Sequence, residues 1–416
     1  MAELYELKEK EERVILVGVS ISDADDTKDS LEELEELAKT AGAKTVGVVI
    51  QNREYMHPGT YVGKGKIDEI KELIWELDAT GIICDDELSP AQMKNLQDEL
   101  DVKVMDRTLL ILDIFAARAT TSEGKIQVEL AQLKYRQSRL AGFGIALSRL
   151  GGGIGTRGPG EKKLEMDRRL IKGRITQLNR ELKEVRRHRE LTREHRAKTK
   201  IPVVAIVGYT NAGKSTLLNK LTGANVLEED KLFATLDPTT RNLRLPSGQE
   251  ILLTDTVGFI RKLPHHLIEA FKSTLEEAKY ADMILHVVDA SNPQMDEQMH
   301  IVYETLKGLD VTDKPVITAF NKQDRLTQSV VLRDFKADHI VNISAKTGEG
   351  LEKMQEILEN VLREKKMAVE CVYPYAEAGK IQMIRKYGEL LEEEYRDDGI
   401  YVKAFVPVEV YEKVKG

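Results

Sequence analysis

A glycine-rich turn between a predicted strand and a predicted helix constrains this chain more than any other feature. The apolar run Val203–Val207 leads into G-x-x-x-x-G-K-S, and the residues after Thr216 are typical of the first turns of a helix. Glycines let successive N–H groups point at one anion, and the helix N-terminus adds a favourable dipole. The predicted nucleotide-binding residues are Gly208, Tyr209, Thr210, Asn211, Ala212, Gly213, Lys214, Ser215 and Thr216.

Two short segments farther along predict a guanine base. An N-K-x-D sequence follows the apolar run Val316–Phe320, so it should lie at the carboxyl end of a strand, where open α/β sheets bind ligands. The Asp324 carboxylate can accept from guanine N1–H and N2–H₂, a donor pair that adenine lacks, and a buried carboxylate left unpaired would disfavour the wrong base. The predicted base-binding residues are Asn321, Lys322, Gln323, Asp324, Ser344, Ala345 and Lys346.

A further motif lies between the phosphate loop and the N-K-x-D sequence, and it predicts hydrolysis of the nucleotide. Ile251–Thr254 is typical of a strand, and Asp255, Thr256, Val257 and Gly258 follow it. Asp255 can hold Mg²⁺ through water while Ser215 binds it directly, and Gly258 can contact the γ-phosphate beside Lys214. Four elements in this order predict a GTPase with Mg²⁺ as its cofactor.

A threonine hydroxyl that joins Mg²⁺ only in the presence of the γ-phosphate should lie before Asp255. Thr235, Thr239 and Thr240 all compete for this role, and each could instead be an ordinary strand or turn threonine. The loop that GTP is expected to order comprises Phe233, Ala234, Thr235, Leu236 and Asp237.

Two residues affect the predicted mechanism. Phe259 stands where many GTPases place the glutamine that orients the attacking water, so a partner, another side chain or an ion must help. Asn211 could provide an oxygen ligand for K⁺, in which case turnover should be faster in K⁺ than in Na⁺, or it could cap its own loop backbone.

Composition limits the remaining possibilities. The 416 residues predict two to four domains, and the net charge of −8 argues against a globally basic nucleic-acid-binding protein. Cys84 and Cys371 give no disulfide framework and are predicted to be reduced, buried thiols. The charged N-terminus has no signal-peptide pattern, and no apolar run approaches the ~20 residues of a membrane span. We therefore expect a cytoplasmic protein.

Residues 1–115 are predicted to form an α/β domain with a parallel sheet. Strands are expected at 14–20, 44–51, 79–84 and 102–105, alternating with helices at 29–40, 67–78 and 89–99. Gly63–Lys66 is expected to be a tight turn with solvated lysines, or a contact with an RNA backbone.

Residues 116–200 are predicted to be a helical linker. Helix is expected over 109–140, followed by a loop rich in glycine and arginine at 141–160 that either links flexibly or moulds to RNA. Residues 161–200 carry fifteen Lys and Arg against seven Asp and Glu on a helical pattern, predicted to be two antiparallel helices or a coiled segment. This excess indicates either a solvated face or an RNA-binding surface.

The remaining boundaries place a GTPase domain at 201–366 and a small α+β domain at 367–416. In the latter, strands are expected at Val369–Tyr373 and Ile400–Val408, with a helix at Gly379–Tyr387 and a solvated acidic run at Glu389–Asp398. The predicted fold class is a multidomain α/β protein with a P-loop GTPase domain.

These motifs resemble the HflX family, P-loop GTPases of the Obg–HflX group, over essentially the whole length. The most specific segments are Tyr61–Lys66, Gly151–Glu161 and Phe233–Arg241. The resemblance implies an N-terminal α/β domain, a helical linker, a GTPase domain and a C-terminal appendage. It assigns the switch threonine to Thr235, so that Ser215, Thr235 and Asp255 would bind the metal and Lys214, Thr235 and Gly258 would act in catalysis.

The resemblance also implies binding to the large ribosomal subunit and its RNA, stimulation of hydrolysis by the ribosome, and splitting of stalled or idle ribosomes under stress. Two other functions remain open at this point. The protein could act in assembly of the large subunit, or it could be a GTP-gated scaffold for RNA or protein. A monomer is the default expectation.

Overall fold

The computed structural model describes residues 11–21, 26–150, 159–199, 201–223, 232–233, 236–263, 275–326, 331–364 and 366–415. For 141–150, 159–164, 190, 192–199 and 408–409 it describes the backbone only. The chain divides by its contacts into two units. The first comprises residues 1–185, 231–233 and 261–271, and the second comprises 186–230, 234–260 and 272–416.

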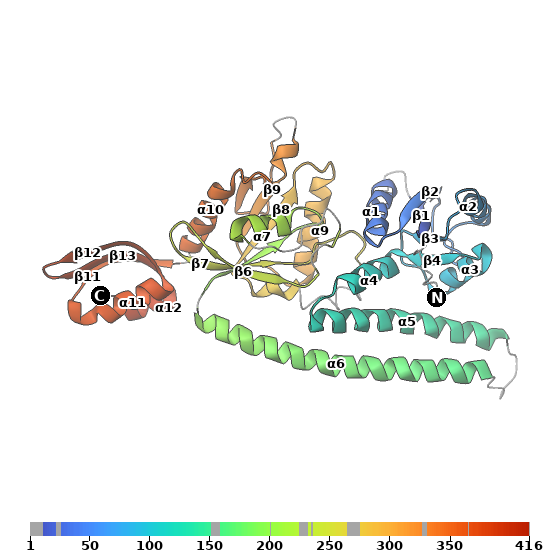
Figure 1. The fold of residues 1–416 in the computed structure, drawn as a ribbon, viewed down its shortest axis with the longest axis horizontal. Helices are drawn as coiled ribbons and strands as arrows, with labels where there is room; N and C mark the ends of the chain where they lie inside the picture. The colour runs from blue at the N-terminus through green and yellow to red at the C-terminus, as the bar shows by residue number, and fades with distance from the viewer. Residues whose placement is uncertain are drawn as a thin grey trace, which may run out of the picture. The chain divides into compact units, whose positions relative to one another are not determined.

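The first unit is built around a four-stranded parallel sheet (Figure 1). Its strands, in the order β2-β1-β3-β4, are β1 (Arg13–Ser20), β2 (Lys44–Asn52), β3 (Gly81–Cys84) and β4 (Lys103–Asp106). Helices α1 (Thr27–Thr40), α2 (Lys64–Glu76) and α3 (Pro90–Leu100) connect them. This alternation confirms the predicted α/β arrangement, because parallel neighbours need a crossover between them.

Local chemistry explains how the helices of this unit begin. The Ser89 hydroxyl accepts from the Gln92 N–H, and the Gln92 side chain reaches back to the Ser89 N–H, which satisfies two backbone donors at the start of α3. Helix α2 begins at Lys64, so the predicted turn at Gly63–Lys66 is wrong for its last three residues. Gly63 supplies the extended residue before that helix.

The predicted helix over 109–140 is two helices, α4 (Arg107–Arg118) and α5 (Ser122–Leu150). The predicted loop at 141–160 is wrong at both ends, because α5 continues to Leu150 and α6 (Pro159–Thr199) begins at Pro159. Gly142 and Gly144 cost a helix only about 1 kcal/mol each relative to Ala, which a long helix tolerates. Residues 151–158 lie outside the described part of the chain.

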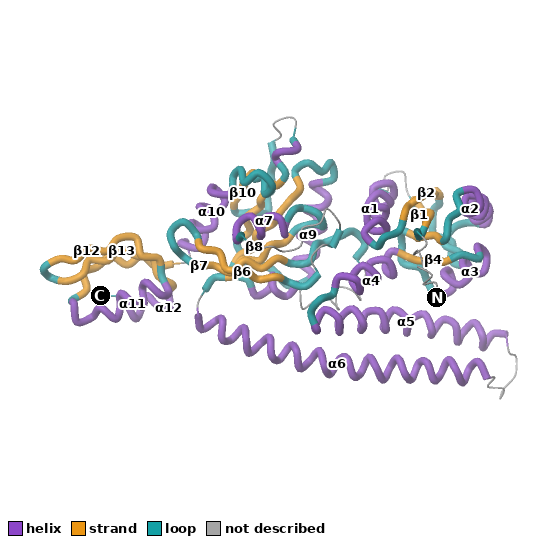
Figure 2. Tube along the Cα trace, viewed as in Figure 1, coloured by secondary structure: helices purple, strands orange, loops and turns teal. Residues whose placement is uncertain are grey.

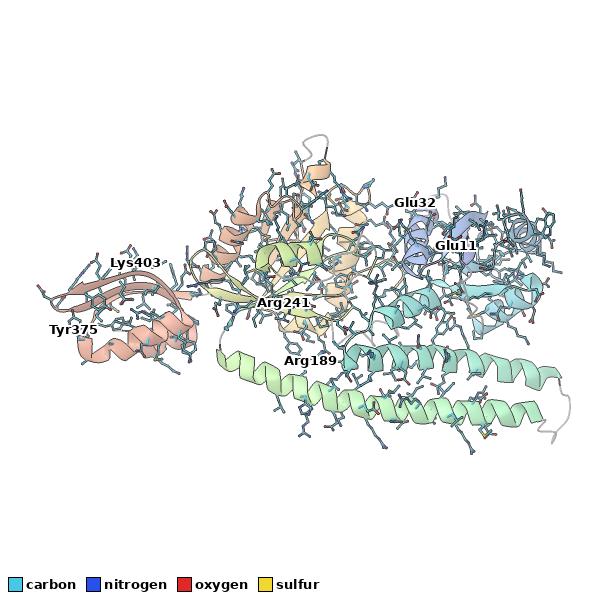
Figure 3. All side chains as sticks on the ribbon, in the orientation of Figure 1. Glu11, Glu32, Arg189, Arg241, Tyr375 and Lys403 are labelled. Carbon is cyan, nitrogen blue, oxygen red and sulfur yellow. The ribbon has the colours of Figure 1, made fainter. Side chains whose placement is uncertain are left out.

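Residues 161–199 were predicted to be two antiparallel helices or a coiled segment, and they form the single helix α6, which packs against the antiparallel helix α5 (Figure 1). The first of these alternatives is therefore wrong. The seam of α5 and α6 in the first unit contains Leu130, Leu178 and Leu182. Beside it Arg174 donates to both oxygens of Glu129 at 2.7 and 2.9 Å. Most of the other basic side chains described on α6 are exposed, and Figure 3 shows the described side chains standing out along the helix.

The second unit contains a six-stranded sheet in the order β10-β9-β8-β5-β7-β6, parallel except for β6. Its strands are β5 (Val203–Val207), β6 (Thr239–Arg244), β7 (Glu250–Asp255), β8 (Met283–Asp289), β9 (Val316–Asn321) and β10 (His339–Asn342). In the described part of the chain its helices are α7 (Lys214–Thr222), α9 (Met295–Gly308) and α10 (Leu351–Glu364), with a 3₁₀ turn at Gln323–Arg325. The carboxyl ends of β5, β7, β8 and β9 therefore meet at one edge.

The C-terminal part of this unit is a three-stranded antiparallel sheet against two helices (Figure 2). It contains β11 (Lys366–Tyr373), β12 (Glu389–Arg396), β13 (Gly399–Pro407), a 3₁₀ turn (Tyr375–Glu377), α11 (Ala378–Tyr387) and α12 (Val408–Val414). The acidic run at 389–398 was expected to be a solvated face between strands, but most of it is the edge strand β12. Buried Glu389 begins this strand and pairs with Arg363 at 2.6 Å.

These sheets confirm the predicted fold class, whereas the boundaries between the four predicted domains remain predictions. Both cysteines are free; Cys84 is buried as expected, but Cys371 is only half-buried. Among the described residues, no helix is both long and apolar enough to cross a membrane.

Candidate functional site

The phosphate loop joins β5 to α7 through backbone conformations that suit glycine. Gly208 and Gly213 have φ values of +154° and +93°. A Cβ on Gly208 would lie 2.2 Å from the Val287 carbonyl oxygen, and one on Gly213 would lie 2.3 Å from Asn321 Nδ2. The loop therefore needs glycine at both positions because neighbouring strands approach so closely.

Lys214 is buried at the first position of α7. Its ammonium donates to the carbonyl oxygens of Gly208 at 3.1 Å and Tyr209 at 2.7 Å. Burial lowers the pKa of Lys214 to about 8, although the nearby Asp255 carboxylate acts in the opposite direction. At neutral pH the ammonium group is still mostly protonated, so its positive charge can neutralise phosphate oxygens.

Ser215 and Asp255 converge from α7 and β7. The Ser215 hydroxyl donates to Asp255 Oδ2 at 2.8 Å. Two hard oxygen donors beside a phosphate loop fit Mg²⁺, which keeps water and phosphate oxygens among its ligands. Among the described residues no cluster of three His, Cys, Asp or Glu side chains exists, so a metal here would rely on those other oxygens.

Gly258 and Phe259 lie directly against the phosphate loop. Phe259 N–H donates to the Gly208 oxygen at 3.1 Å, and Thr210 N–H donates to the Phe259 oxygen at 2.8 Å. A Cβ on Gly258 would be 2.8 Å from Thr210 Cα and 3.1 Å from Lys214 Nζ. The Phe259 ring is buried and carries no group that could orient water.

The predicted base-binding segments meet at the ends of β9 and β10. Asn321 Nδ2 donates to the Ala212 oxygen, and Asn321 Oδ1 accepts from Ala345 N–H, both at 2.9 Å. One side chain thus joins the phosphate loop to the Ser344–Lys346 turn. The Ser344 hydroxyl donates to Asp324 Oδ1 at 2.6 Å, a bond that lowers the pKa of this carboxyl.

Two expectations about this region need correction. Asp324 was expected to be buried, but its side chain is exposed on the 3₁₀ turn, where it can meet a base from solvent. Thr239 and Thr240 lie within β6, and the Thr240 and Thr254 hydroxyls share a hydrogen bond of 3.0 Å, so these two are strand threonines. Ala234 and Thr235 lie outside the described residues.

Of the remaining predicted residues, Leu236 is buried and Asp237 is half-buried. The Thr256 hydroxyl donates to the Ile206 oxygen at 2.8 Å and thereby links β5 to the segment after β7. Contact of any of these groups with a nucleotide stays a prediction.

One contact at the candidate site is not predicted by the motifs. Lys322, with φ of +63°, forms an ion pair of 2.7 Å with Asp289 at the end of β8. The pair fixes the orientation of the lysine side chain of N-K-x-D. The apolar run that ends at Asp289 was the available signal, because polar residues at the carboxyl ends of parallel strands gather at one edge.

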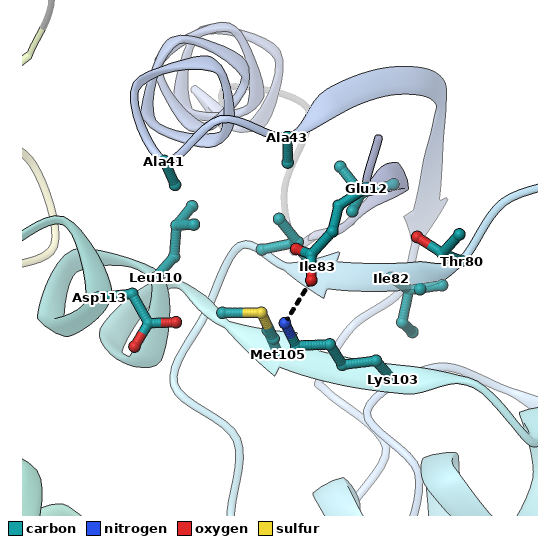
Figure 4. A pocket seen from close by; sticks show the side chains of 12 residues that line it. Glu12, Ala41, Ala43, Thr80, Ile82, Ile83, Lys103, Met105, Leu110 and Asp113 are labelled. Carbon is teal, nitrogen blue, oxygen red and sulfur yellow. Dashed lines mark hydrogen bonds and ion pairs between the residues drawn. The ribbon is translucent and has the colours of Figure 1, made fainter. Parts of the chain in front are cut away.

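In the first unit, a cavity of about 60 Å³ lies at the edge of the sheet where strands β1, β3 and β4 begin (Figure 4). Glu12 and Lys103 face each other there at 3.0 Å. A space of this size holds a few water molecules and is far below the size of a nucleotide pocket.

Comparisons with known families and proteins agree with this geometry. Successive parts of the chain match families described as GTP-binding GTPase N-terminal (28–116), GTP-binding GTPase Middle Region (118–196) and 50S ribosome-binding GTPase (203–322). GTPase HflX of Lacrimispora saccharolytica is 70% identical over 411 residues, which cover 99% of this chain and 97% of the relative. GTPase HflX of Escherichia coli K12 is 45% identical over 325 residues, which cover 77% and 76%.

Solved structures also match. A complex of SsGBP with GDP is 27% identical and aligns with a TM-score of 0.49 over 84% of this chain and 98% of that one. A GTP-binding protein of Sulfolobus solfataricus with GDP is 26% identical and aligns with a TM-score of 0.46 over 85% and 99%.

Proposed function

Because this chain belongs to the HflX family of GTPases, we propose that it binds the large ribosomal subunit and uses GTP to split stalled or idle ribosomes under stress. The observation that carries the proposal is the geometry of the predicted nucleotide site, whose phosphate loop, Asp255 and Asn321 lie in the segment 203–322 that matches the 50S ribosome-binding GTPase family. Hydrolysis of GTP is the activity of the family. The ribosome as partner would place this work in the cytoplasm, and we expect the protein to act as a monomer.

The first support is that Phe259 cannot orient the attacking water. Phe259 is buried against the phosphate loop, where a glutamine would orient water in many GTPases. A site that aligns phosphates well but water poorly should hydrolyse GTP slowly by itself. A large partner that completes the site would therefore act both as target and as activator.

The second support is the charge of α6. The protein has a net charge of −8, yet residues 161–200 carry fifteen basic against seven acidic residues. Exposed cations of the described part include Arg169, Lys172, Arg180, Lys183 and Arg187. Such a local excess on an acidic protein suits a polyanion such as ribosomal RNA.

For the metal, we expect Mg²⁺ at Ser215 and Asp255, with Thr235 as the residue that joins it in the GTP state. Mg²⁺ would neutralise charge on the β- and γ-phosphates. The chain itself orients those phosphates through the loop amides and Lys214. Asn211, with φ of +59°, remains a candidate ligand for K⁺.

Sedimentation of purified ribosomes tests the proposal. We expect the protein with GTP to convert assembled ribosomes into free subunits, whereas GDP should not support this and Lys214→Ala should be inactive with either nucleotide. If assembled ribosomes stay intact and only large-subunit precursors respond, the protein acts in assembly. If a hydrolysis-blocked form keeps every activity through repeated rounds, a scaffold replaces the proposed cycle.

A further inference from the structure

Thr210, within the phosphate loop, has a buried side chain whose hydroxyl finds no partner in the described part of the protein. The residue is 6% exposed, and among the described residues no group forms a hydrogen bond with its Oγ1. Buried polar side-chain atoms are nearly always hydrogen-bonded, because burial without a partner costs the free energy of their lost hydration. This hydroxyl therefore calls for a partner from outside the chain.

Other hydroxyls around the nucleotide site do have partners within the protein. Those of Ser215, Thr256 and Ser344 each donate to an oxygen of the chain, at distances between 2.6 and 2.8 Å. Of the buried side-chain hydroxyls that the structure describes in the second unit, that of Thr210 alone has no partner. It is thus the hydroxyl that this site leaves for a ligand.

The Thr210 side chain lies where the γ-phosphate is expected. The Thr210 N–H donates to the Phe259 oxygen at 2.8 Å, which fixes the backbone at this point. A Cβ on Gly258 would lie 2.8 Å from Thr210 Cγ2 and 3.1 Å from Lys214 Nζ, so these three residues converge on one small region. Gly258 and Lys214 are the expected γ-phosphate contacts. Since Oγ1 and Cγ2 are bonded to the same Cβ, the Thr210 hydroxyl lies beside this region as well.

A hydroxyl at this place can do what the Phe259 ring cannot. It accepts one hydrogen bond through its oxygen while it donates another through its hydrogen. A water molecule that attacks the γ-phosphate has a hydrogen to donate, and the γ-phosphate has oxygens that accept. Both halves of the Thr210 hydroxyl therefore match partners that are present together only with GTP.

We propose that Thr210 is a catalytic residue of GTP hydrolysis, whose hydroxyl accepts a hydrogen bond from the attacking water and donates one to a γ-phosphate oxygen. The water oxygen bonds to the γ-phosphorus, and the bond from that phosphorus to the oxygen shared with the β-phosphate breaks, with its electron pair leaving on GDP. The proton that the water loses passes to a γ-phosphate oxygen, and Thr210 keeps its own. This alignment of water supports the slow hydrolysis expected of the protein alone. The inference rests on the proposed nucleotide site and not on the ribosome as partner.

The test compares Thr210→Val with the unaltered protein in the absence of ribosomes. Valine replaces the hydroxyl by a methyl group and keeps the shape of the side chain. We expect kcat at saturating GTP to fall about tenfold or more, because a hydrogen-bonding group aimed at the reacting atoms is lost. The Kd for GDP, which has no γ-phosphate, should change less than twofold. Thr210→Ser keeps the hydroxyl and should retain most of the rate.

The stability of the nucleotide-free protein separates this role from a structural one. Removal of a buried hydroxyl that has no partner should leave the melting temperature of Thr210→Val unchanged or higher. Thr318→Val is the matched control, because the Thr318 hydroxyl is also buried but donates to Asp334 Oδ2 at 2.6 Å. This control should melt at a lower temperature and keep its kcat.

Three outcomes would overturn the catalytic role of Thr210. The first is an unchanged kcat in Thr210→Val. The second is an equal loss of kcat and of GDP affinity, since the hydroxyl would then shape the loop for any nucleotide. The third is a melting temperature lowered as far as that of Thr318→Val. None of these measurements contains ribosomes, so they leave the proposed ribosomal partner to its own test.

Discussion

Asp324→Asn should exchange the nucleotide preference from GTP to XTP. We expect GTP affinity to fall about 100-fold, because two charge-assisted hydrogen bonds from guanine to the carboxylate are lost. Xanthine presents N1–H together with an O2 acceptor, which match the oxygen and the NH₂ group of an asparagine. The Ser344 hydroxyl donates to Asp324 Oδ1, a bond that an amide oxygen can keep, so the turn should not reorganise.

Competition between labelled GTP and XTP measures this change directly. Asp296→Asn is the matched control, since it removes an exposed carboxylate from α9 outside the site and should leave the preference for GTP intact. A variant that loses both nucleotides equally would indicate a structural role for Asp324. One that keeps full GTP affinity would remove Asp324 from the base site.

Gly213→Ala should abolish nucleotide binding. The added Cβ would lie 2.3 Å from Asn321 Nδ2, and φ at this position is +93°. Asn321 would have to move, which breaks its bonds to Ala212 and Ala345 and separates the phosphate loop from the base-binding turn. We expect GDP affinity to fall at least 100-fold, equivalent to about 2.7 kcal/mol.

Gly223→Ala shows whether a Cβ at Gly213 prevents nucleotide binding through its clash with Asn321 or through the left-handed backbone conformation. Gly223 ends α7 with φ of +65°, but a Cβ there would meet no atom of the described residues within 4 Å. This variant should cost about 1–2 kcal/mol of stability from the left-handed conformation alone and should keep its GDP affinity. If both variants bind GDP equally, close approach to Asn321 is not what requires Gly213.

Much of the nucleotide site was predictable because its residues follow strands. An apolar run specifies a parallel strand, and the residues at its carboxyl end must lie at the ligand edge whatever the rest of the fold is. Lys214, Asp255 and Asn321 converge for this reason. The same rule brings Asp289 to this edge, but its ion pair with Lys322 also depends on the left-handed backbone of Lys322, which the residue pattern does not indicate.

The errors arose where local pattern and tertiary context disagree. Residues 389–396 are rich in glutamate, which disfavours strands, yet pairing with the apolar strand β13 makes them β12. Gly142 and Gly144 suggested a loop, but the helix α5 continues through them. Both segments look polar or flexible in isolation and gain their structure from neighbours.

The burial of the Thr210 hydroxyl without a partner could not be predicted from the sequence. The G-x-x-x-x-G-K-S pattern leaves this position open to many residue types, and the hydroxyl could as well have faced solvent. Only the packing of Gly258 against the Thr210 side chain shows that it is buried at the phosphate loop.

We expect the large ribosomal subunit to supply the help in orienting water that Phe259 cannot give. The most direct measurement is the rate of GTP hydrolysis by the purified protein alone and with purified large ribosomal subunits. We predict that the subunits raise this rate by about tenfold or more, equivalent to at least about 1.4 kcal/mol of the activation barrier. An identical rate with and without subunits, at concentrations where binding is shown by cosedimentation, would contradict the claim.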